Sequence, residues 1–548
     1  MTLVDRYLLE QQELTAVERF SQRHEAAELP LQSQYYAALL PAAPPGPGEQ
    51  YAFEVDLGAC SGCKACVAAC NSLNGLDESE TWRDVGLLHG GSDAEPFLQH
   101  VTAACHHCLD PACLNVCPVQ AYEKSETTGI VRHLDDQCIG CQYCILACPY
   151  DVPKYNRARG IVRKCDLCSQ RLAVGEAPAC VQSCPNGAIR ITTVRREEAA
   201  ANCEAGTFLP GAPDPQFTQP TTNYRTSRVF PRNTLPADYF SVRPEHAHWP
   251  LALMLVLTQL SVGTFLVALV LELLPLSTPL RETRAADATG ALFFGLVALA
   301  ASTLHLGRPH LAFRALVGLR SSWLSREILA FGLFAVLAVV YAVSALLSDP
   351  IKSPTLHLAL GAGVVGAGLA GIVCSIMIYC CTKRVLWNGP ATAARFLLTT
   401  LLLGQATALL TRLVGADLAS LPAVAVMHDS AAVLIPGLIV VAAAKLLFEA
   451  SLFCHLGSKQ MTPLKRSALL MTSDLARAAK WRFVLGAVGG ILLPVIWLCR
   501  AEVSTSDTVL LHLVVGGQFA ALLLGELLER HLFFTAVVAS RMPGGLRT

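Results

Sequence analysis

The chain has 548 residues, more than one hydrophobic core normally organises, and it carries 42 basic and 42 acidic side chains. A balanced net charge, with no basic stripe interleaved with aromatic residues, gives no support to nucleic acid as a partner. Cysteines and charged residues concentrate before residue 249 and apolar residues dominate after it, which excludes a single soluble domain and predicts two unlike halves.

Residues 1–50 are predicted to form an N-terminal extension that ends in a Pro-rich linker. Residues 1–40 favour one or two polar helices, the first with a loosely amphipathic face. The apolar residues of that face are Leu8, Leu9, Val17 and Phe20. Residues 41–48, PAAPPGPG, break helices and predict the linker. The pattern leaves two interpretations open, a docking arm for another subunit and a plain extension, and it favours the plain extension.

Sixteen of the 22 cysteines fall in four short groups between residues 60 and 184. The groups are Cys60, Cys63, Cys66 and Cys70; Cys105, Cys108, Cys113 and Cys117; Cys138, Cys141, Cys144 and Cys148; and Cys165, Cys168, Cys180 and Cys184. Three groups end in Cys-Pro, and the third has the C-x2-C-x2-C-x3-C-P spacing that holds [4Fe–4S] clusters in bacterial ferredoxins. Four groups of four thiolates predict four [4Fe–4S] clusters and therefore a path for electrons.

Disulfides and zinc are the competing uses of such cysteines. Cysteines so close in sequence rarely reach disulfide geometry, and the first 30 residues contain no apolar signal segment that would lead the domain to an oxidising compartment. Structural zinc needs only two separated cysteine pairs, and the prolines after Cys117, Cys148 and Cys184 are not part of that pattern. The spacing therefore favours iron–sulfur clusters.

Short strands are predicted at residues 51–57, 129–134 and 188–194, between and around the cysteine groups. This alternation predicts an α+β domain over residues 51–204, built as two ferredoxin-like modules, one inserted within the other. In ferredoxins the fourth cysteine of a run ligates the other cluster of the pair. That rule predicts four ligand sets: Cys60, Cys63, Cys66 and Cys184; Cys165, Cys168, Cys180 and Cys70; Cys105, Cys108, Cys113 and Cys148; and Cys138, Cys141, Cys144 and Cys117.

Residues 205–248 are rich in Pro, Thr and Arg and predict a linker, whereas residues 249–548 predict an all-α membrane domain. Eight apolar stretches are long enough to span a bilayer, which takes about 20 residues per crossing. They are residues 250–275, 290–306, 327–348, 355–380, 392–413, 429–450, 482–499 and 508–528. Lys445 and Glu449, one helical turn apart in the sixth stretch, favour a neutralised ion pair over a proton relay.

Basic residues near the ends of the stretches predict the orientation in the membrane. Nineteen Lys and Arg residues fall on the side shared with the cysteine-rich half, against five on the opposite side. Those five are Arg281, Arg284, Lys352, Arg412 and Arg500. Because basic loops stay in the cytoplasm, the count predicts a multi-pass protein of the cytoplasmic (inner) membrane with its iron–sulfur domain on the cytoplasmic side.

The four cysteine groups resemble the four-cluster electron-transfer subunit of the dimethyl sulfoxide reductase family of molybdenum enzymes. The membrane half is similar to that family's eight-helix anchor subunit, through residues 304–309 (LHLGRP), 313–315 (FRA) and 324–327 (LSRE). The resemblance covers about residues 51–200 and 249–530 and implies a fusion of two subunits that are normally separate. It further implies that quinol (menaquinol or ubiquinol) is oxidised at the anchor. The electrons would then pass to a separate molybdopterin-containing catalytic subunit, since nothing in this sequence resembles a pterin-binding domain.

The resemblance implies that His305 and Glu327 take part in quinol oxidation. A quinol that loses two electrons must lose two protons, which a His and a carboxyl group at the membrane edge are suited to accept. The alternatives are a helix-end His that bonds a carbonyl and an acid that complements a helix dipole. Some related subunits replace the third cysteine of the second group by Trp and hold a [3Fe–4S] centre, whereas this sequence has Cys113. The resemblance also implies that groups two and three lie nearest the quinol.

Two other functions stay open at this point. The same cofactors also suit reverse flow, from a partner dehydrogenase to quinone, and a membrane scaffold with purely structural clusters is the third hypothesis. The terminal acceptor is not defined by the sequence, and dimethyl sulfoxide, nitrate and a sulfur oxyanion are the candidates. Haem b is not expected as a cofactor, because no pair of His residues on facing spans stands out.

Overall fold

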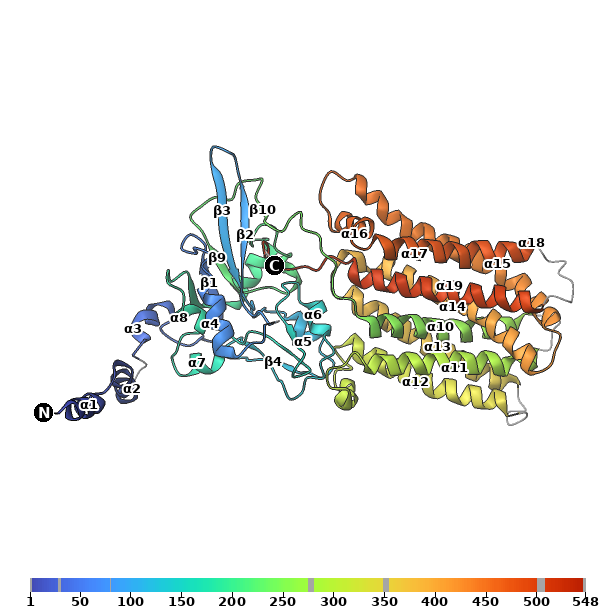
Figure 1. Cartoon of the computed structure of the whole chain (residues 1–548), viewed down its shortest axis with the longest axis horizontal. Coiled ribbons are helices and arrows are strands. Elements are labelled where there is room, and N and C mark those ends of the chain that lie inside the picture. The colour runs from blue at the N-terminus through green and yellow to red at the C-terminus, as the bar shows by residue number, and fades with distance from the viewer. Residues whose placement is uncertain are drawn as a thin grey trace.

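The computed structural model describes residues 2–27, 31–78, 80–274, 280–347, 354–499 and 508–545. Figure 1 shows three parts in a row: a helical arm at the N-terminus, a cysteine-rich half that extends to His248, and a helical bundle that starts at Trp249. The predicted fold class is confirmed, since a ferredoxin-type region is followed by a helical domain with eight candidate membrane helices. The boundaries proposed for the domains stay predictions.

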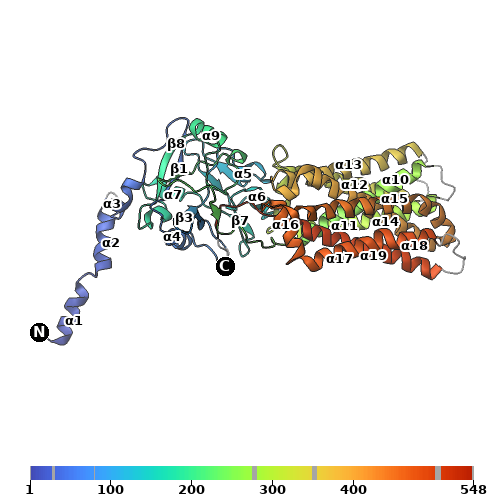
Figure 2. The ribbon, with the colours of Figure 1, turned by 90° about the horizontal axis from the view of Figure 1, so that it is seen from above.

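The arm consists of α1 (Leu3–Gln12) and α2 (Ala16–Ala26). Thr2 and Thr15 begin these helices with capping boxes, so both helices are stabilised by local hydrogen bonds. Neither helix has a buried residue, and Figure 2 shows both extending away from the rest of the molecule. The arm is joined to the cysteine-rich half through α3 (Ser33–Tyr36) and η1 (Ala37–Leu39), where Tyr36 is buried in the core.

Four small sheets organise the cysteine-rich half over the ranges that the structure describes. Their strands are β1 (Glu49–Asp56), β2 (Asp84–Gly91), β3 (Pro96–Ala103), β4 (Tyr122–Lys124), β5 (Val131–His133), β6 (Lys154–Asn156), β7 (Ile161–Arg163), β8 (Ile189–Arg195), β9 (Asn223–Arg225) and β10 (Leu235–Pro236). The antiparallel pairing of β1 with β8 joins the two ends of the cysteine region, and β9 adds to β1 in parallel. The remaining sheets are β10-β2-β3, β4-β5 and β6-β7. The strands predicted at both ends of the region and before the third cysteine group correspond to β1, β8 and β5.

Short helices carry or follow the cysteines. They are α4 (Ala65–Asn74), α5 (Ala112–Asn115), α6 (Tyr143–Ala147), α7 (Ser169–Ala173), α8 (Ala179–Gln182), α9 (Arg196–Glu204) and η2 (Pro215–Phe217). The residues just before α4, α6 and α7 are Lys64, Gln142 and Cys168, and all three have positive φ angles. A left-handed residue turns the backbone sharply into the helix, so that thiols before and after the turn face the same space.

The bundle contains ten α-helices among the described residues. They are α10 (Trp249–Leu273), α11 (Leu280–Thr303), α12 (Trp323–Leu346), α13 (Pro354–Cys380), α14 (Gly389–Leu418), α15 (Ala423–Ala450), α16 (Pro463–Thr472), α17 (Ala476–Ala487), α18 (Leu493–Cys499) and α19 (Thr508–Thr535). Short turns η3 (Pro309–Leu316), η4 (Val385–Trp387), η5 (Ser451–Gly457) and η6 (Val488–Leu492, a π-turn) connect or interrupt them. Within the described residues, eight helical segments are long and apolar enough to span a membrane, with α17, η6 and α18 forming the seventh.

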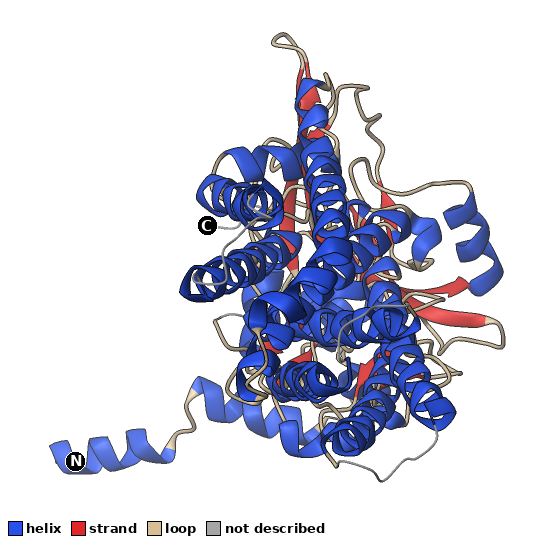
Figure 3. Cartoon of the chain, turned by 90° about the vertical axis from the view of Figure 1, so that its right-hand side faces the viewer, coloured by secondary structure: helices blue, strands red, loops and turns tan. Residues whose placement is uncertain are grey.

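Figure 3 views the bundle from the end opposite the cysteine-rich half. Of the candidate spans among the described residues, α10 and α14 are the most buried. At their crossing, a Cβ atom on Gly263 would overlap the carbonyl oxygen of Thr400, so the backbones meet directly. Small residues at such a crossing allow the close packing that stabilises membrane helices. Of the five basic residues predicted on the side away from the cysteine-rich half, Lys352 and Arg500 lie outside the described residues, and the side chain of Arg281 is not described.

The loop between α11 and α12 joins the bundle to the cysteine-rich half. The backbone N–H of Arg308 donates to the Ile139 carbonyl (3.0 Å), and that of Gly318 donates to the Pro118 carbonyl (2.8 Å). The Tyr143 hydroxyl of α6 donates to the Ile378 carbonyl of α13 (3.0 Å). These bonds seat the third cysteine group directly on the end of the bundle.

Residues 536–545, after the last span, return to the cysteine-rich half. The Leu87 N–H in β2 donates to the Gly544 carbonyl (3.0 Å), and Arg541 pairs with Asp238 in the linker (2.9 Å). The Gly544 N–H also donates to the Asp238 carboxylate (2.9 Å). The two halves are therefore held together by this tail as well as by residues 205–248.

Candidate functional site

We describe the sixteen grouped cysteines in the four sets that the ferredoxin rule predicts, each with members from two of the sequence groups. We name them quartet A (Cys60, Cys63, Cys66, Cys184), quartet B (Cys70, Cys165, Cys168, Cys180), quartet C (Cys105, Cys108, Cys113, Cys148) and quartet D (Cys117, Cys138, Cys141, Cys144). Burial raises the pKa of Cys60 most, and the nearby Cys66, Cys184 and Cys63 raise it further. Burial likewise raises the pKa of Cys70 to about 12, with Cys180 as its strongest thiol neighbour.

The same relation holds in the other two quartets. Burial is the main cause of the raised pKa of Cys113, and Cys148 and Cys105 add to it. Burial also raises the pKa of Cys141, with Cys117 as the strongest thiol neighbour. For these four thiols, a neighbouring thiol comes from the other group of the pair that the ferredoxin rule predicts. Their role as cluster ligands stays a prediction.

The quartets follow one another from the far side of the cysteine-rich half to the bundle. Cys66 of quartet A neighbours Cys180 of quartet B, and Cys165 of quartet B neighbours Cys105 of quartet C. Tyr122 lies between quartets C and D, because Cys144, Cys113 and Cys117 all act on its hydroxyl. Cys63 at one end is exposed, whereas Cys141 at the other end packs against the apolar core of the bundle.

Buried cations lie beside the thiols, as expected if the quartets bind an anionic cluster. The Nζ atom of Lys164 lies 3.6 Å from the Cys105 sulfur. Arg83 is 2% exposed, and its Nε and Nη2 atoms meet no acceptor in the part of the protein that the structure describes. Such donors fit the sulfur atoms of an iron–sulfur cluster, whose net charge and hydrogen bonds tune its potential. Among the described residues no three His, Cys, Asp or Glu side chains form a site for a single metal ion.

His305 lies at the junction of the two halves, beside quartet D. Its ring is hydrogen-bonded to the backbone of Cys141, and its centroid lies 5.2 Å from that of His248. Burial lowers the pKa of His305 to about 4. Burial also lowers the pKa of His248 to about 3, and the neighbouring His305 and His246 lower it further. Both imidazoles are therefore neutral at pH 7 and able to accept a proton. His248 was not identified from the sequence, although the run of His246 and His248 at the start of the first span is a usable signal.

Glu327 is 3% exposed on α12, where its Oε1 atom accepts a hydrogen bond from the Ser375 hydroxyl of α13. Burial, with Cys381 and Glu327 as the strongest charged neighbours, raises the pKa of Tyr143 in α6. No hydrogen bond or ion pair joins Glu327 to His305 within the described ranges. The structure thus brings each of them close to the Cys141–Tyr143 turn, but it does not bring them into contact with each other.

A cavity of about 440 Å³ opens between α6 and the bundle. Its lining includes Leu146 and Cys148 from the cysteine-rich half and His248, Trp387 and Phe534 from the bundle side. Arg384 also lines it, with its guanidinium 4.9 Å from the centre of the Trp387 ring. An aromatic wall with a few polar groups beside a quartet thiol is a suitable environment for a flat, redox-active ring.

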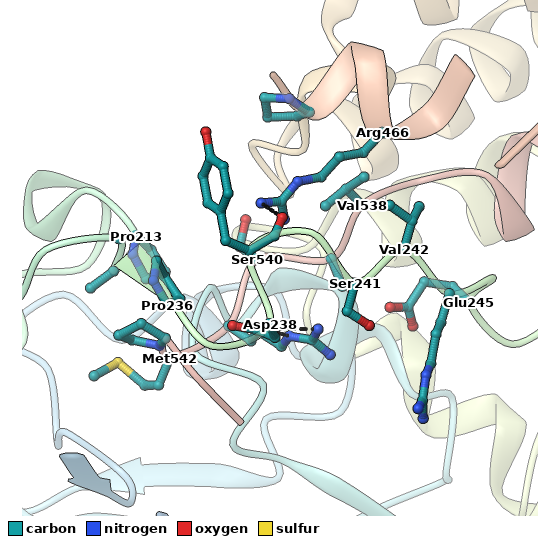
Figure 4. A pocket seen from close by; sticks show the side chains of 18 of the residues that line it. Pro213, Pro236, Asp238, Ser241, Val242, Glu245, Arg466, Val538, Ser540 and Met542 are labelled. Atoms are coloured by element: carbon teal, nitrogen blue, oxygen red, sulfur yellow. Dashed lines mark hydrogen bonds and ion pairs between the residues drawn. The ribbon is translucent and has the colours of Figure 1, made fainter. Parts of the chain in front are cut away.

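A larger cavity of about 560 Å³ lies between the linker, α16 and the C-terminal tail (Figure 4). Arg466 of α16 donates to the Tyr239 carbonyl there (2.6 Å), and Asp238 holds Arg541. Glu245 lines both cavities. None of the sixteen cysteines, His305 or Glu327 lines the larger cavity. Its walls come from the linker, α16 and the C-terminal tail, whose contacts hold the two halves together.

The predicted pair of Lys445 and Glu449 is part of a larger charged cluster inside the bundle. Lys445 lies 3.4 Å from Glu449 and 3.2 Å from Glu526, and Arg482 contacts both carboxylates at 2.8 Å. All four side chains are buried. Two cations therefore neutralise two anions across α15, α17 and α19, which compensates the cost of placing charge at membrane depth.

Comparisons with known proteins match both halves. The family described as "4Fe-4S dicluster domain" matches residues 97–194, and the family described as "DMSO reductase anchor subunit (DmsC)" matches residues 244–536. The probable anaerobic dimethyl sulfoxide reductase chain YnfG of Escherichia coli (strain K12) is 39% identical over 181 residues, which are 31% of this chain and 86% of that protein.

Two further relatives match part of the chain. The B subunit of anaerobic dimethyl sulfoxide reductase of Escherichia coli (strain K12) is 42% identical over 144 residues, which are 25% of this chain and 70% of that protein. Hydrogenase-2 operon protein HybA of Escherichia coli O157:H7 is 35% identical over 222 residues, 36% of this chain and 66% of that protein. The two family matches thus fall on different halves of one polypeptide.

Proposed function

Since this polypeptide belongs to the DMSO reductase anchor family (DmsC) and also carries an iron–sulfur region like that of the reductase B subunit, we propose that it oxidises quinol. The protein is an electron-transfer subunit fused to the membrane anchor of a dimethyl sulfoxide reductase-like complex, and it is a multi-pass membrane protein. Such a complex implies a molybdopterin-containing catalytic partner. In our proposal the electrons travel from quinol through four [4Fe–4S] clusters to that partner.

The observation that carries the proposal is the series of neighbouring thiols between Cys141, which packs against the bundle core, and the exposed Cys63. When bound, the clusters supply one-electron carriers, and quartets A to D are the residues that would hold them. Every quartet neighbours the next, so no step needs a mobile carrier. Cys141 contacts the bundle core and thus offers the entry point, while Cys63 offers the exit.

We assign the quinol headgroup to the cavity of about 440 Å³ beside quartets C and D. Trp387 and Phe534 provide an apolar wall for the ring, and the neutral imidazole of His248 is placed to accept a hydroxyl proton. His305 packs against His248 and passes that proton on, so it acts from behind the cavity wall. Glu327 does not line this cavity, and its proposed part is acceptance of the second proton on the other side of Tyr143.

The proposed orientation places the cysteine-rich half in the cytoplasm, because nineteen basic residues near the span ends share its side. The catalytic partner would determine the terminal electron acceptor, for which dimethyl sulfoxide, nitrate and a sulfur oxyanion are the candidates. Reverse flow and a scaffold with structural clusters are the outcomes that the next experiment separates from quinol oxidation.

The test is the rate at which menaquinol reduces the clusters of the purified complex, followed by freeze-quench electron paramagnetic resonance. His305→Gln should slow that reduction by roughly a hundredfold, the usual contribution of a positioned proton acceptor. His455→Gln, at an exposed His of η5, serves as the control and should leave the rate unchanged. Dithionite should reduce both variants fully. Clusters that never respond to menaquinol would favour the scaffold, and an unchanged rate in His305→Gln would remove this residue from the site.

A further inference from the structure

Arg83 is a buried cation without a carboxylate partner in the part of the protein that the structure describes. It precedes β2, is 2% exposed, and stacks its guanidinium 4.5 Å from the centre of the Phe53 ring. Its Nη1 atom donates to the Thr102 hydroxyl (3.1 Å), but Nε and Nη2 have no acceptor among the described residues. A buried charge is costly unless something neutralises it, so an anionic group is expected beside Arg83.

The groups that surround Arg83 are quartet thiols. Cys180, Cys165 and Cys70 of quartet B and Cys66 of quartet A act on the guanidinium and raise its pKa, against the opposite effect of burial. The Thr102 hydroxyl that holds Arg83 also lies 3.6 Å from the Cys66 sulfur. The natural counter-ion of Arg83 is therefore the anionic centre that quartet B holds, with quartet A next to it.

Positive charge is distributed unevenly along the four quartets. Lys164 lies between quartets B and C, with its Nζ atom 3.6 Å from the Cys105 sulfur and hydrogen-bonded to the Cys165 carbonyl (2.7 Å). The strongest electrostatic neighbours of the thiols in quartet D include His133 but neither Lys nor Arg. Fixed cations thus lie beside the thiols of quartets B and C, whereas near quartet D Arg308 and Arg314 bond the Asp135 and Asp136 carbonyls.

We propose that Arg83 raises the reduction potential of the cluster in quartet B, and so makes the end remote from the bundle the electron-accepting end. This inference rests on the proposed function, because it takes the quartets to hold clusters. A guanidinium stays protonated at all relevant pH values, and in a low-dielectric interior its charge favours the reduced, more negative state of a neighbouring cluster. One electron leaves the centre at quartet D and one arrives at quartet B, with no bond made or broken. The charge pattern therefore favours flow from the bundle towards the partner.

The experiment is a redox titration of the purified complex with chemical mediators, followed by electron paramagnetic resonance. Arg83→Gln should shift the potential of the quartet B signal, and more weakly that of quartet A, to lower values, while the signals of quartets C and D stay in place. Arg190→Gln removes the same charge from the half-exposed outer face of β8, where Arg190 pairs with Glu54, and should shift none of them. Arg83→Lys keeps the charge and should restore most of the wild-type value.

Four unchanged potentials in Arg83→Gln would overturn the proposal, and so would equal shifts in Arg83→Gln and Arg83→Lys. If Arg83→Gln fails to keep its clusters, the potential of quartet B in Thr102→Val tests the proposal instead. This variant frees Nη1 of Arg83 and should produce a smaller shift, whereas an unchanged quartet B potential counts against the proposal. A wild-type protein in which quartet D has a higher potential than quartet B would overturn the direction of flow. Because mediators replace quinol, failure of the quinol site would leave all these potentials unaffected, and absence of clusters would instead refute the proposed function.

Discussion

Cys113 is the residue that decides whether quartet C is complete. It is buried and lies close to Cys148 and Cys105. In Cys113→Ser a hydroxyl, which ionises far less readily than a thiol, replaces one ligand, so one of the four clusters should be lost or become [3Fe–4S]. Iron content and electron paramagnetic resonance of the purified complex measure this. The control is Cys203→Ser, at a buried cysteine outside the quartets, and four unchanged [4Fe–4S] signals in Cys113→Ser would contradict the ligand assignment.

His305 should leave a signature in the pH dependence of cluster reduction. Burial lowers its pKa to about 4, so the imidazole is neutral and able to accept a proton above that value. As the pH falls through about 4 the ring becomes protonated, and its advantage as an acceptor disappears. The ratio of wild-type to His305→Gln reduction rates should therefore stay constant from neutral pH downward and decline only near that value. A decline centred near the ordinary His pKa of about 6.5 would contradict the buried environment.

At the scale of elements, the loop between α11 and α12 governs how closely quartet D approaches the bundle. A Cβ atom on Gly307 would overlap the Gly160 carbonyl oxygen, so no side chain fits without moving one backbone. Gly307→Ala should cost about 1–3 kcal/mol of stability, as overpacking does, and should slow reduction of the clusters by quinol. Thermal unfolding in detergent and the reduction rate measure both effects.

Gly332→Ala is the matched control for that loop variant. Gly332 lies on α12 with no atom within 4 Å of its missing Cβ, so an added methyl group meets open space. This substitution should leave the stability and the rate close to those of the wild type. Equal behaviour of Gly307→Ala and Gly332→Ala would show that the contact with Gly160 does not set the distance between quartet D and the bundle.

The elements that were predictable from the sequence are those with a local signal. Cysteine spacing is a local pattern, and it predicts the iron–sulfur region that the family match confirms, while the four ligand sets stay a prediction. Long apolar runs are also local, and all eight predicted spans are confirmed as helices, with boundaries that differ by several residues. The hairpin of β2 and β3 was not predicted, since Gly86, Gly90 and Gly91 weaken the strand pattern there.

Residues that act through distant contacts carry no such signal. Arg83 reaches quartet B only because the fold brings its loop against Cys180, and its sequence neighbours give no hint of this. His248 faces His305 from the start of another helix, and its role depends on a contact between residues far apart in sequence. The cavity that Cys148 of quartet C lines has walls from both halves, so neither half alone defines it. These features follow from tertiary structure, which spacing and hydropathy do not encode.

At the scale of the whole molecule, orientation is the property that the basic residues predict. Protease added to sealed, right-side-out cells should spare residues 1–248, because the count of Lys and Arg places them inside. Immunoblotting against the arm and the cysteine-rich half follows the digestion. Cells opened before protease treatment provide the control and should lose the exposed arm. Digestion of the arm in intact cells would reverse the orientation.

The return of the C-terminal tail to β2 has a consequence for biogenesis. Leu87 is translated early, yet the backbone group that it binds belongs to Gly544, which follows the last membrane-spanning helix. During synthesis the Leu87 N–H at one edge of this sheet therefore stays without its Gly544 partner until the bundle has been inserted.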